Sequence, residues 1–155
     1  MKKKIICLIM TISAFVSTVA VNAEDNVKVI VDGEQVVFED QAPVIIEERT
    51  LVPIRAVMEA LGKKVDWNGD LQQAIVYDEY ITVKLTLNSN VMINEVKDPI
   101  TGEVFEFDTE LDVAPQLIND RTCLPIRAVV EAFGIAVDWD QETQSVLILS
   151  DALLC

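Results

Sequence analysis

Residues 49–62 read RTLVPIRAVMEALG, and residues 121–134 read RTCLPIRAVVEAFG, which is nearly the same phrase. When residues 40–77 are aligned with residues 112–149, without a gap, 18 of the 38 positions are identical. Internal similarity at a fixed spacing is the signature of a chain that repeats one supersecondary unit. The sequence therefore predicts a duplicated fold.

Each phrase predicts a short helix. Pro53 and Pro125 suit the first helical position, where no N–H is needed, and Gly62 and Gly134 suit a left-handed residue that ends a helix. A helix of barely two turns is not stable alone in water, so its apolar face must pack against other structure. The apolar residues at the i, i+3, i+4 and i+7 positions of that face are Ile54, Val57, Met58 and Leu61 in the first phrase, and Ile126, Val129, Val130 and Phe133 in the second.

Segments with strand character surround both predicted helices, and Asp32-Gly33 and Asn68-Gly69 are typical of tight hairpin turns. The sequence predicts the α+β class: two tandem repeats, residues 24–88 and 89–155, each a twisted antiparallel β-sheet wrapped around one short α-helix. Units of about 60 residues are near the lower size limit for independent stability, so we expect them to pack together. The predicted strands are residues 27–31, 34–38, 63–67, 73–77 and 81–87, followed by residues 91–93, 103–107, 136–139 and 145–149.

The N-terminus has the pattern of an export signal. Residues 1–4 are basic after Met1, residues 5–21 are apolar apart from small polar residues, and Val21-Asn22-Ala23 is typical of a signal-peptidase site. We therefore expect residues 1–23 to be a signal peptide, and the mature chain to be secreted or associated with the cell envelope. An uncleaved anchor is the alternative, because the apolar run is close to the shortest that spans a bilayer. No other segment predicts a membrane span.

The charge balance limits the choice of partners. The chain has 12 basic and 26 acidic residues, a net charge of −14. Loss of the three leader lysines leaves nine basic residues and a net charge of −17. Such an acidic protein does not attract nucleic acid or an anionic membrane over long range. A cationic partner or divalent ions would suit it, and solubility alone is the simpler explanation of the charge.

Residues 42–67 and 114–139 share one pattern: an Ala-Pro pair, an isoleucine-containing strand, R-T-x-x-P-x-R, E-A-x-G and V-D-W. In this pattern the chain resembles, twice and over nearly the whole mature length, the copper amine oxidase N-terminal domain-like module, or stalk domain. The resemblance implies antiparallel sheet curled around a helix in a secreted or wall-associated protein. It also implies an accessory part, distant from the copper and the redox cofactor of the name-giving enzymes, with no agreed ligand.

The composition argues against catalysis. The chain has no histidine, so it lacks imidazole ligands for a copper site of the amine oxidase kind. The same absence excludes Ser–His and Cys–His nucleophile systems and the usual zinc hydrolase sites. A small hydrolase based on two carboxylates remains open because acids are plentiful, but no pair stands out. We predict a protein that is not an enzyme and has no cofactor and no metal site.

The recurring charged residues are predicted to have structural roles. Two pairs lie four residues apart and can form ion pairs on the exposed side of each helix: Arg55 with Glu59, and Arg127 with Glu131. The arginine that opens each motif is predicted to bridge strand and helix through the aspartate of the V-D-W segment: Arg49 with Asp66, and Arg121 with Asp138.

The exposure of the aromatic residues distinguishes a module that binds carbohydrate from one that does not. Trp67 and Trp139 share a strand face with the valine two residues before them, so we predict core positions for both. The alternative is an exposed platform for sugar rings. Tyr77 and Tyr80 are better candidates for exposure, although two tyrosines are a weak sign of carbohydrate binding.

Residues 66–70 and 138–142 place acidic or amide side chains at every second position, as the start of a calcium loop does. The continuation fails, because Leu71 and Thr143 stand where the loop needs glycine. Tyr77 and Leu149 stand where it needs glutamate. We therefore predict tight turns without a specific calcium site.

Two cysteines, Cys123 and Cys155, lie beyond the leader. Cys123 occupies the place of Leu51 in the other phrase, which predicts a buried thiol. An exported chain permits a disulfide, but two cysteines at unmatched positions do not predict one. Whether they form a bridge stays open.

The leading functional hypothesis is a secreted, non-catalytic envelope module that acts as a binding, spacer or assembly domain. The second is a carbohydrate- or wall-polymer-binding protein, which would need the tryptophans or tyrosines exposed in a row. The small hydrolase is the third. The partner, an envelope protein or a wall polymer, and the oligomeric state are not predicted.

Overall fold

The computed structural model describes residues 27–150, so the predicted signal peptide and Cys155 lie outside the described residues. This part of the chain is mostly β-sheet with two short helices, in agreement with the predicted α+β class. The helices are α1 (Ile54–Ala60) and α2 (Ile126–Ala132). The strands are β1 (Lys28–Val31), β2 (Glu34–Gln35), β3 (Val44–Ile46), β4 (Arg49–Pro53), β5 (Lys64–Asn68), β6 (Gln73–Tyr77), β7 (Ile81–Thr86), β8 (Val91–Lys97), β9 (Val104–Glu110), β10 (Gln116–Ile118), β11 (Arg121–Pro125), β12 (Ala136–Asp140) and β13 (Ser145–Leu149).

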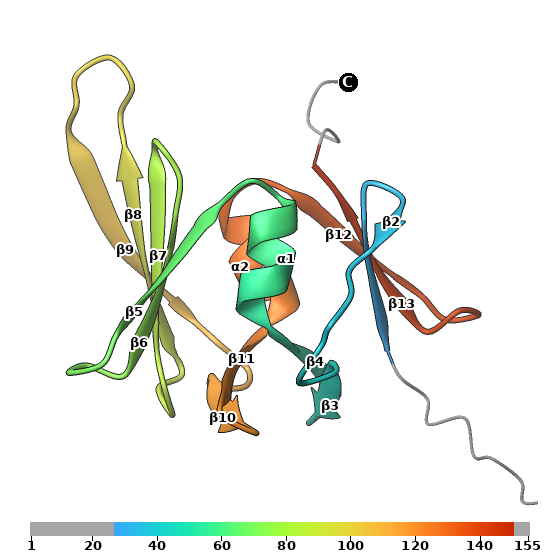
Figure 1. Ribbon diagram of the computed structural model, residues 1–155. Helices are drawn as coiled ribbons and strands as arrows, with labels where there is room; N and C mark the ends of the chain where they lie inside the picture. The colour runs from blue at the N-terminus through green and yellow to red at the C-terminus, as the bar shows by residue number, and fades with distance from the viewer. Residues whose placement is uncertain (1–26, 151–155) are drawn as a thin grey trace, which may run out of the picture.

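The two helices lie between two outer sheets, and a small third sheet lies at one end of them (Figure 1). One outer sheet has the strand order β12-β13-β1-β2, and the other has the order β5-β6-β7-β8-β9. The small sheet has the order β10-β11-β4-β3. The bounds of α1, β3, β4, β5 and β6 recur 72 residues later in α2, β10, β11, β12 and β13.

Both outer sheets take strands from both halves of the chain. β1 pairs in parallel with β13, where Val29 lies opposite Val146. In the other sheet, β7 lies between β6 and β8 and pairs antiparallel with each. The prediction that each repeat wraps its own sheet around its own helix therefore needs correction. Each half alone is small for a stable core, and the shared sheets give one continuous core from both halves.

β4 and β11 join the two halves at the centre of the small sheet. They pair antiparallel, with Val52 opposite Leu124 and Leu51 opposite Pro125. Val52 and Leu124 occupy the same position in the two phrases, so this pair lies on an approximate twofold axis. The side chains of Leu51, Val52 and Leu124 are fully buried.

Each helix begins directly after its proline and ends two residues before its glycine. Pro53 and Pro125 cap the helices in an extended conformation, so each helix starts one residue later than predicted. Gly62 and Gly134 both have a φ of 71°, the left-handed conformation that the sequence predicts. The N–H of each glycine bonds to the carbonyl three residues earlier, and this bond closes the last turn.

The predicted apolar helix faces form the centre of the core. Val57 and Val129 are fully buried, as are Met58 and Val130 next to them. All four belong to one cluster that also contains buried residues of both outer sheets. Removal of this apolar surface from water is the main stabilising term for so small a chain.

Candidate functional site

Two grooves open on the surface, one beside the start of each helix. The first, which we call the Trp67 groove, lies between α1, the edge strand β5 and the β10–β11 hairpin. Its lining includes Arg55 from the helix, Asp66 and Trp67 from β5, and Asp120 and Arg121 from the hairpin. Its volume of about 390 Å³ is in the range of sites for small ligands.

The second, which we call the Trp139 groove, lies between α2, the edge strand β12 and the β3–β4 hairpin. Its lining includes Arg127 from the helix, Asp138 and Trp139 from β12, and Glu48 and Arg49 from the hairpin. Its volume is about 860 Å³.

The two grooves are equivalent, because every residue that lines the Trp67 groove has a counterpart 72 residues away in the Trp139 groove. Each groove combines the helix of one half with the hairpin of the other. The sequence predicts each recurring residue separately, but it does not predict that they converge in one groove, because this depends on the pairing of β4 with β11. The pairs of identical type are Pro53/Pro125, Ile54/Ile126, Arg55/Arg127, Val65/Val137, Asp66/Asp138, Trp67/Trp139, Arg121/Arg49 and Thr122/Thr50.

The tryptophans are groove residues. Trp67 is 45% exposed, so its predicted core position is wrong. Trp139 is half-buried, packs against the core, and donates from Nε1 to Gln141 Oε1 at 3.0 Å. Each tryptophan is the last residue but one of its strand, Trp67 in β5 and Trp139 in β12. They line different grooves and do not form a row.

The arginines that open the motifs pair across the two halves. Arg49 Nη2 lies 2.7 Å from Asp112 Oδ2, and Arg121 bonds to Asp40. The predicted bridges from Arg49 and Arg121 to the V-D-W aspartates, Asp66 and Asp138, are therefore wrong. The cause is the pairing of β4 with β11, which places each arginine beside the segment that precedes the first strand of the other half's hairpin.

The helix arginines pair as their spacing predicts. Arg55 Nη1 lies 3.7 Å from Glu59 Oε1, and Arg127 Nη1 lies 3.4 Å from Glu131 Oε1. Arg127 also donates to the carbonyl oxygen of Val137 at 3.0 Å and so links α2 to β12. More than half of each arginine side chain remains exposed, which leaves donors available to a ligand in each groove.

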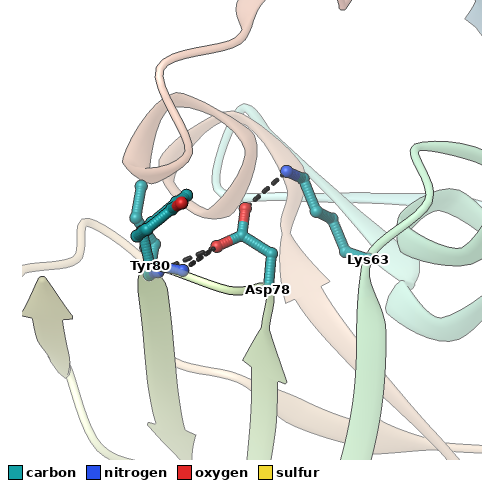
Figure 2. Close-up of polar contacts among 4 residues, drawn as sticks. Lys63, Asp78 and Tyr80 are labelled. Atoms are coloured by element: carbon teal, nitrogen blue, oxygen red, sulfur yellow. Dashed lines mark hydrogen bonds and ion pairs between the residues drawn. The ribbon is translucent and has the colours of Figure 1, made fainter. Parts of the chain in front are cut away.

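A further polar cluster joins the connection between α1 and β5 to the β6–β7 turn (Figure 2). Asp78 accepts from Lys63 Nζ at 2.6 Å, and from the backbone N–H groups of Tyr80 and Ile81 at 2.9 and 2.8 Å. Burial raises the pKa of Asp78, but these hydrogen bonds outweigh burial and hold the pKa below its ordinary value. Lys63 also lies 5.1 Å from the ring centre of Phe133, in the other half. Because its oxygen atoms already accept these hydrogen bonds, this carboxylate has a structural role.

The two acid-rich turns satisfy their own side chains. Asn68 Oδ1 accepts from the N–H groups of Asp70 and Leu71, both at 3.1 Å. Asp140 Oδ1 accepts from the N–H groups of Glu142 and Thr143. Within residues 27–150, no group of three or more His, Cys, Asp or Glu side chains is arranged to hold a metal ion. The turns therefore have the form of tight hairpin connections.

Cys123 is fully buried beside Leu51 and Val113. Burial raises the pKa of its thiol to about 11. The thiolate is the reactive form of cysteine, so this side chain behaves as an apolar residue. The environment agrees with the buried position that its alignment with Leu51 predicts.

The fold and the grooves define a mostly β domain of the α+β class, with paired open surface sites that combine an aromatic ring, guanidinium groups and carboxylates. The family model of the copper amine oxidase N-terminal domain matches residues 30–148, and the chain belongs to this family. Domains of this family are non-catalytic stalk domains. None of the curated proteins and none of the solved structures compared with the chain matches it. Between residues 27 and 150, no helix has the length and apolar character that a bilayer crossing requires.

Proposed function

We propose that the protein is an exported, non-catalytic envelope module, built from two tandem copies of the stalk domain, that binds a ligand and acts as a spacer. Membership in a family of non-catalytic stalk domains supports the class. The recurrence of α1 in α2, and of β5 in β12, supports two copies.

The observation that carries the binding function is the equivalence of the two grooves. Core residues recur in any duplicated fold because both copies need a core. The exposed ring of Trp67 and the exposed guanidinium groups of Arg55 and Arg127 fill no core position, and Trp139, although half-buried against the core, repeats Trp67 in the second groove. Two equivalent sites of this kind suit a ligand with a repeating structure.

Binding of the chain formed by residues 24–155 to purified cell walls of the producing organism tests this function. We expect the protein to sediment with the walls, and the Trp67→Ala/Trp139→Ala variant to lose affinity by roughly tenfold or more, as loss of central aromatic contacts does. Tyr80→Ala is the matched control, because it removes an exposed aromatic ring outside both grooves. If all three proteins bind the walls equally, the grooves are not the binding sites.

The second candidate function is specific binding of a hydroxyl-rich wall polysaccharide, and the exposure of Trp67 favours it. An aromatic ring covers the apolar face of a sugar, and the planar side chains of Arg55 and Asp66 can hydrogen-bond to its hydroxyl groups. The two tryptophans do not form a row, so each groove would take its own short segment. Titration with polysaccharide fragments should quench tryptophan fluorescence and saturate at two segments per chain. Saturation at one would contradict equivalent sites.

Amine oxidation and copper binding test the non-catalytic part of the proposal. The whole chain lacks histidine, so tight copper binding has no imidazole to use. After dialysis against a mild chelator, the protein should hold no stoichiometric copper and should release no peroxide from an amine, with or without added copper. Retention of about one copper per chain would overturn this part of the proposal.

Export is tested by N-terminal sequencing of the protein recovered from outside the producing cells. The basic start, the apolar run and Ala23 support cleavage just before Glu24. Full-length protein in the cytosol would contradict export, and full-length protein in the membrane would favour the uncleaved anchor.

A further inference from the structure

We propose that the open edge of β9 accepts an added β-strand from a basic partner, an extended segment in which apolar residues alternate with Lys or Arg. β9 (Val104–Glu110) is the last strand of its sheet, and the β8–β9 hairpin reaches beyond β7 at the upper left of Figure 1. An exposed edge strand presents unpaired backbone groups and is a template for another chain.

The hydrogen-bond pattern shows which backbone groups of β9 are free. At the two ends of the hairpin, the N–H of Leu111 donates to Asn90 at 2.7 Å, and the N–H of Asp98 donates to Glu103 at 2.8 Å. In an antiparallel ladder, hydrogen-bonded and non-hydrogen-bonded residue pairs alternate. These two pairs are hydrogen-bonded, so they determine which of the pairs between them are hydrogen-bonded and which are not. The residues whose N–H and C=O groups face the open edge are Val104, Glu106, Asp108 and Glu110.

The other edges of the described sheets are less available. β2 has two residues, and β3 and β10 have three each. β5 and β12 have five residues each and line the two grooves. β9 has seven residues, and Phe105 and Phe107 on it are 56% and 53% exposed. Short edges resist strand addition, whereas a long edge with exposed aromatic rings invites it.

A hollow beside the edge can receive alternate side chains of the added strand. Phe107 lies opposite Asn94 and shares the face of the sheet that turns toward α2. There, Phe107 and Thr109 line a hollow of about 490 Å³ together with Ala128 and Ala132 of the helix. The charged residues of its lining include two ion pairs, Arg49 with Asp112 and Arg127 with Glu131. Strand addition gains affinity from main-chain hydrogen bonds and specificity from such pockets. Apolar side chains at every second position would enter this hollow.

The opposite face of β9 is acidic, and this selects a basic partner. Glu106 lies directly opposite Glu95, whose carboxylate is already paired with Lys84. Among the ion pairs of residues 27–150, none includes Glu106, Asp108 or Glu110. Opposite charges on directly facing strand residues stabilise pairing, and like charges destabilise it. A Lys or Arg facing each acid would complete this side of the sheet.

The same acids disfavour a second copy of the chain at this edge. Residues that face each other across a ladder lie on the same side of the sheet. Pairing of β9 with another β9 through its free groups would therefore set acids of one strand against acids of the other. The net charge of −14 on each chain adds long-range repulsion.

Two synthetic peptides test the proposal on the chain formed by residues 24–155. Both are about eight residues long, the length of a strand; one alternates Lys with Val, and the other alternates Glu with Val. We expect the Lys/Val peptide to bind in calorimetric titration and to bind less tightly as salt is added, because salt screens exposed charge pairs. We expect the Glu/Val peptide not to bind.

Variants at Asp108 separate the backbone contribution from the charge. Asp108→Pro removes an N–H that faces the open edge and leaves the β8–β9 ladder intact, since proline is tolerated where the N–H of an edge strand faces solvent. It should weaken binding of the Lys/Val peptide by roughly tenfold or more, because a hydrogen bond and a charge are lost together. Asp108→Asn removes the charge alone and should weaken binding by roughly fivefold or less. If circular dichroism shows that Asp108→Pro does not fold, Glu106→Pro takes its place, because the N–H of Glu106 also faces the open edge.

Three results would overturn the proposal. Equal binding of the two peptides would show that the acidic face does not select the partner. Full binding by folded Asp108→Pro and Glu106→Pro variants would show that the edge is not paired. A dimer of the chain in sedimentation experiments that the Lys/Val peptide cannot dissociate would assign the edge to a second copy.

Discussion

Arg49 and Asp112 form an ion pair between the two halves of the chain, with Nη2 and Oδ2 2.7 Å apart. Arg121 and Asp40 form the reciprocal pair. In the sequence, each arginine follows its own half's aspartate by nine residues, yet it pairs with the aspartate of the other half. Two exposed ion pairs therefore bracket the β4–β11 contact, and each sets the position of an arginine in a groove.

A double-mutant cycle with Arg49→Met and Asp112→Asn should measure this contact. We expect a coupling of about 0.2–1 kcal/mol in the free energy of unfolding, because both side chains are substantially exposed to water. Urea denaturation at low and high salt provides the measurement, and high salt should reduce the coupling. The control cycle pairs Arg49→Met with Asp66→Asn, whose residues line different grooves, and its coupling should be near zero. A larger coupling of Arg49 to Asp66 than to Asp112 would support the ion pair that the sequence predicts.

Val57→Asp and Val129→Asp should each destabilise the whole domain. Both valines are fully buried in the shared core, and an unpaired carboxylate there costs about 3 kcal/mol or more in the free energy of unfolding. Ala60→Asp is the control, because it adds the same charge on the exposed side of α1. Thermal melting measures the effect. A Val57→Asp variant that melts like Ala60→Asp would show that the helix face is wrongly assigned.

Local signals in the sequence predict the local structure well. Asp32 and Gly33 have φ values of 50° and 87°, as a two-residue hairpin turn requires. The left-handed glycine after each helix and the buried apolar stripe along it are also found where the sequence predicts them. These features depend on neighbours a few residues apart, so one stretch of sequence is enough to specify them.

Partners that lie far apart in the chain could not be predicted in the same way. The pairing of Val29 with Val146 joins opposite ends of the described chain, and alternation shows which face a strand buries but not which strand it joins. For the same reason, alternation assigns Trp67 and Trp139 to a strand face but does not show how much of each ring neighbouring elements cover, and Trp67 is 45% exposed. The sequence predicts a partner for Arg49 in its own half, because the exchange of hairpins between the halves leaves no local signal.

The Asp78 carboxylate makes the stability of the domain depend on acidity. Its hydrogen bonds and Lys63 hold its pKa below the ordinary value of 3.8, so it stabilises the fold fully above that pH, and this stabilisation is lost as the pH falls through the lowered pKa. Asp78→Asn should therefore cost roughly 1 kcal/mol near neutral pH, and the difference from the parent should shrink below about pH 4. Asp70→Asn, which removes a charge from an exposed turn, is the control in urea denaturation at several pH values. A difference for Asp78→Asn that stays constant down to strongly acidic pH would contradict this role.

The thiol of Cys123 should be unreactive in the folded protein. The side chain has no exposed surface, and burial raises its pKa to about 11, so neither the thiolate nor a path for the reagent is available near neutral pH. In the chain formed by residues 24–155 with Cys155→Ser, an aromatic disulfide reagent should detect no thiol at pH 8 under native conditions and one thiol per chain in concentrated urea. Cys123→Ala in the same background should give no signal in either condition, which checks that the signal comes from this residue. One thiol per chain that reacts within minutes in the native protein would contradict the buried position beside Leu51.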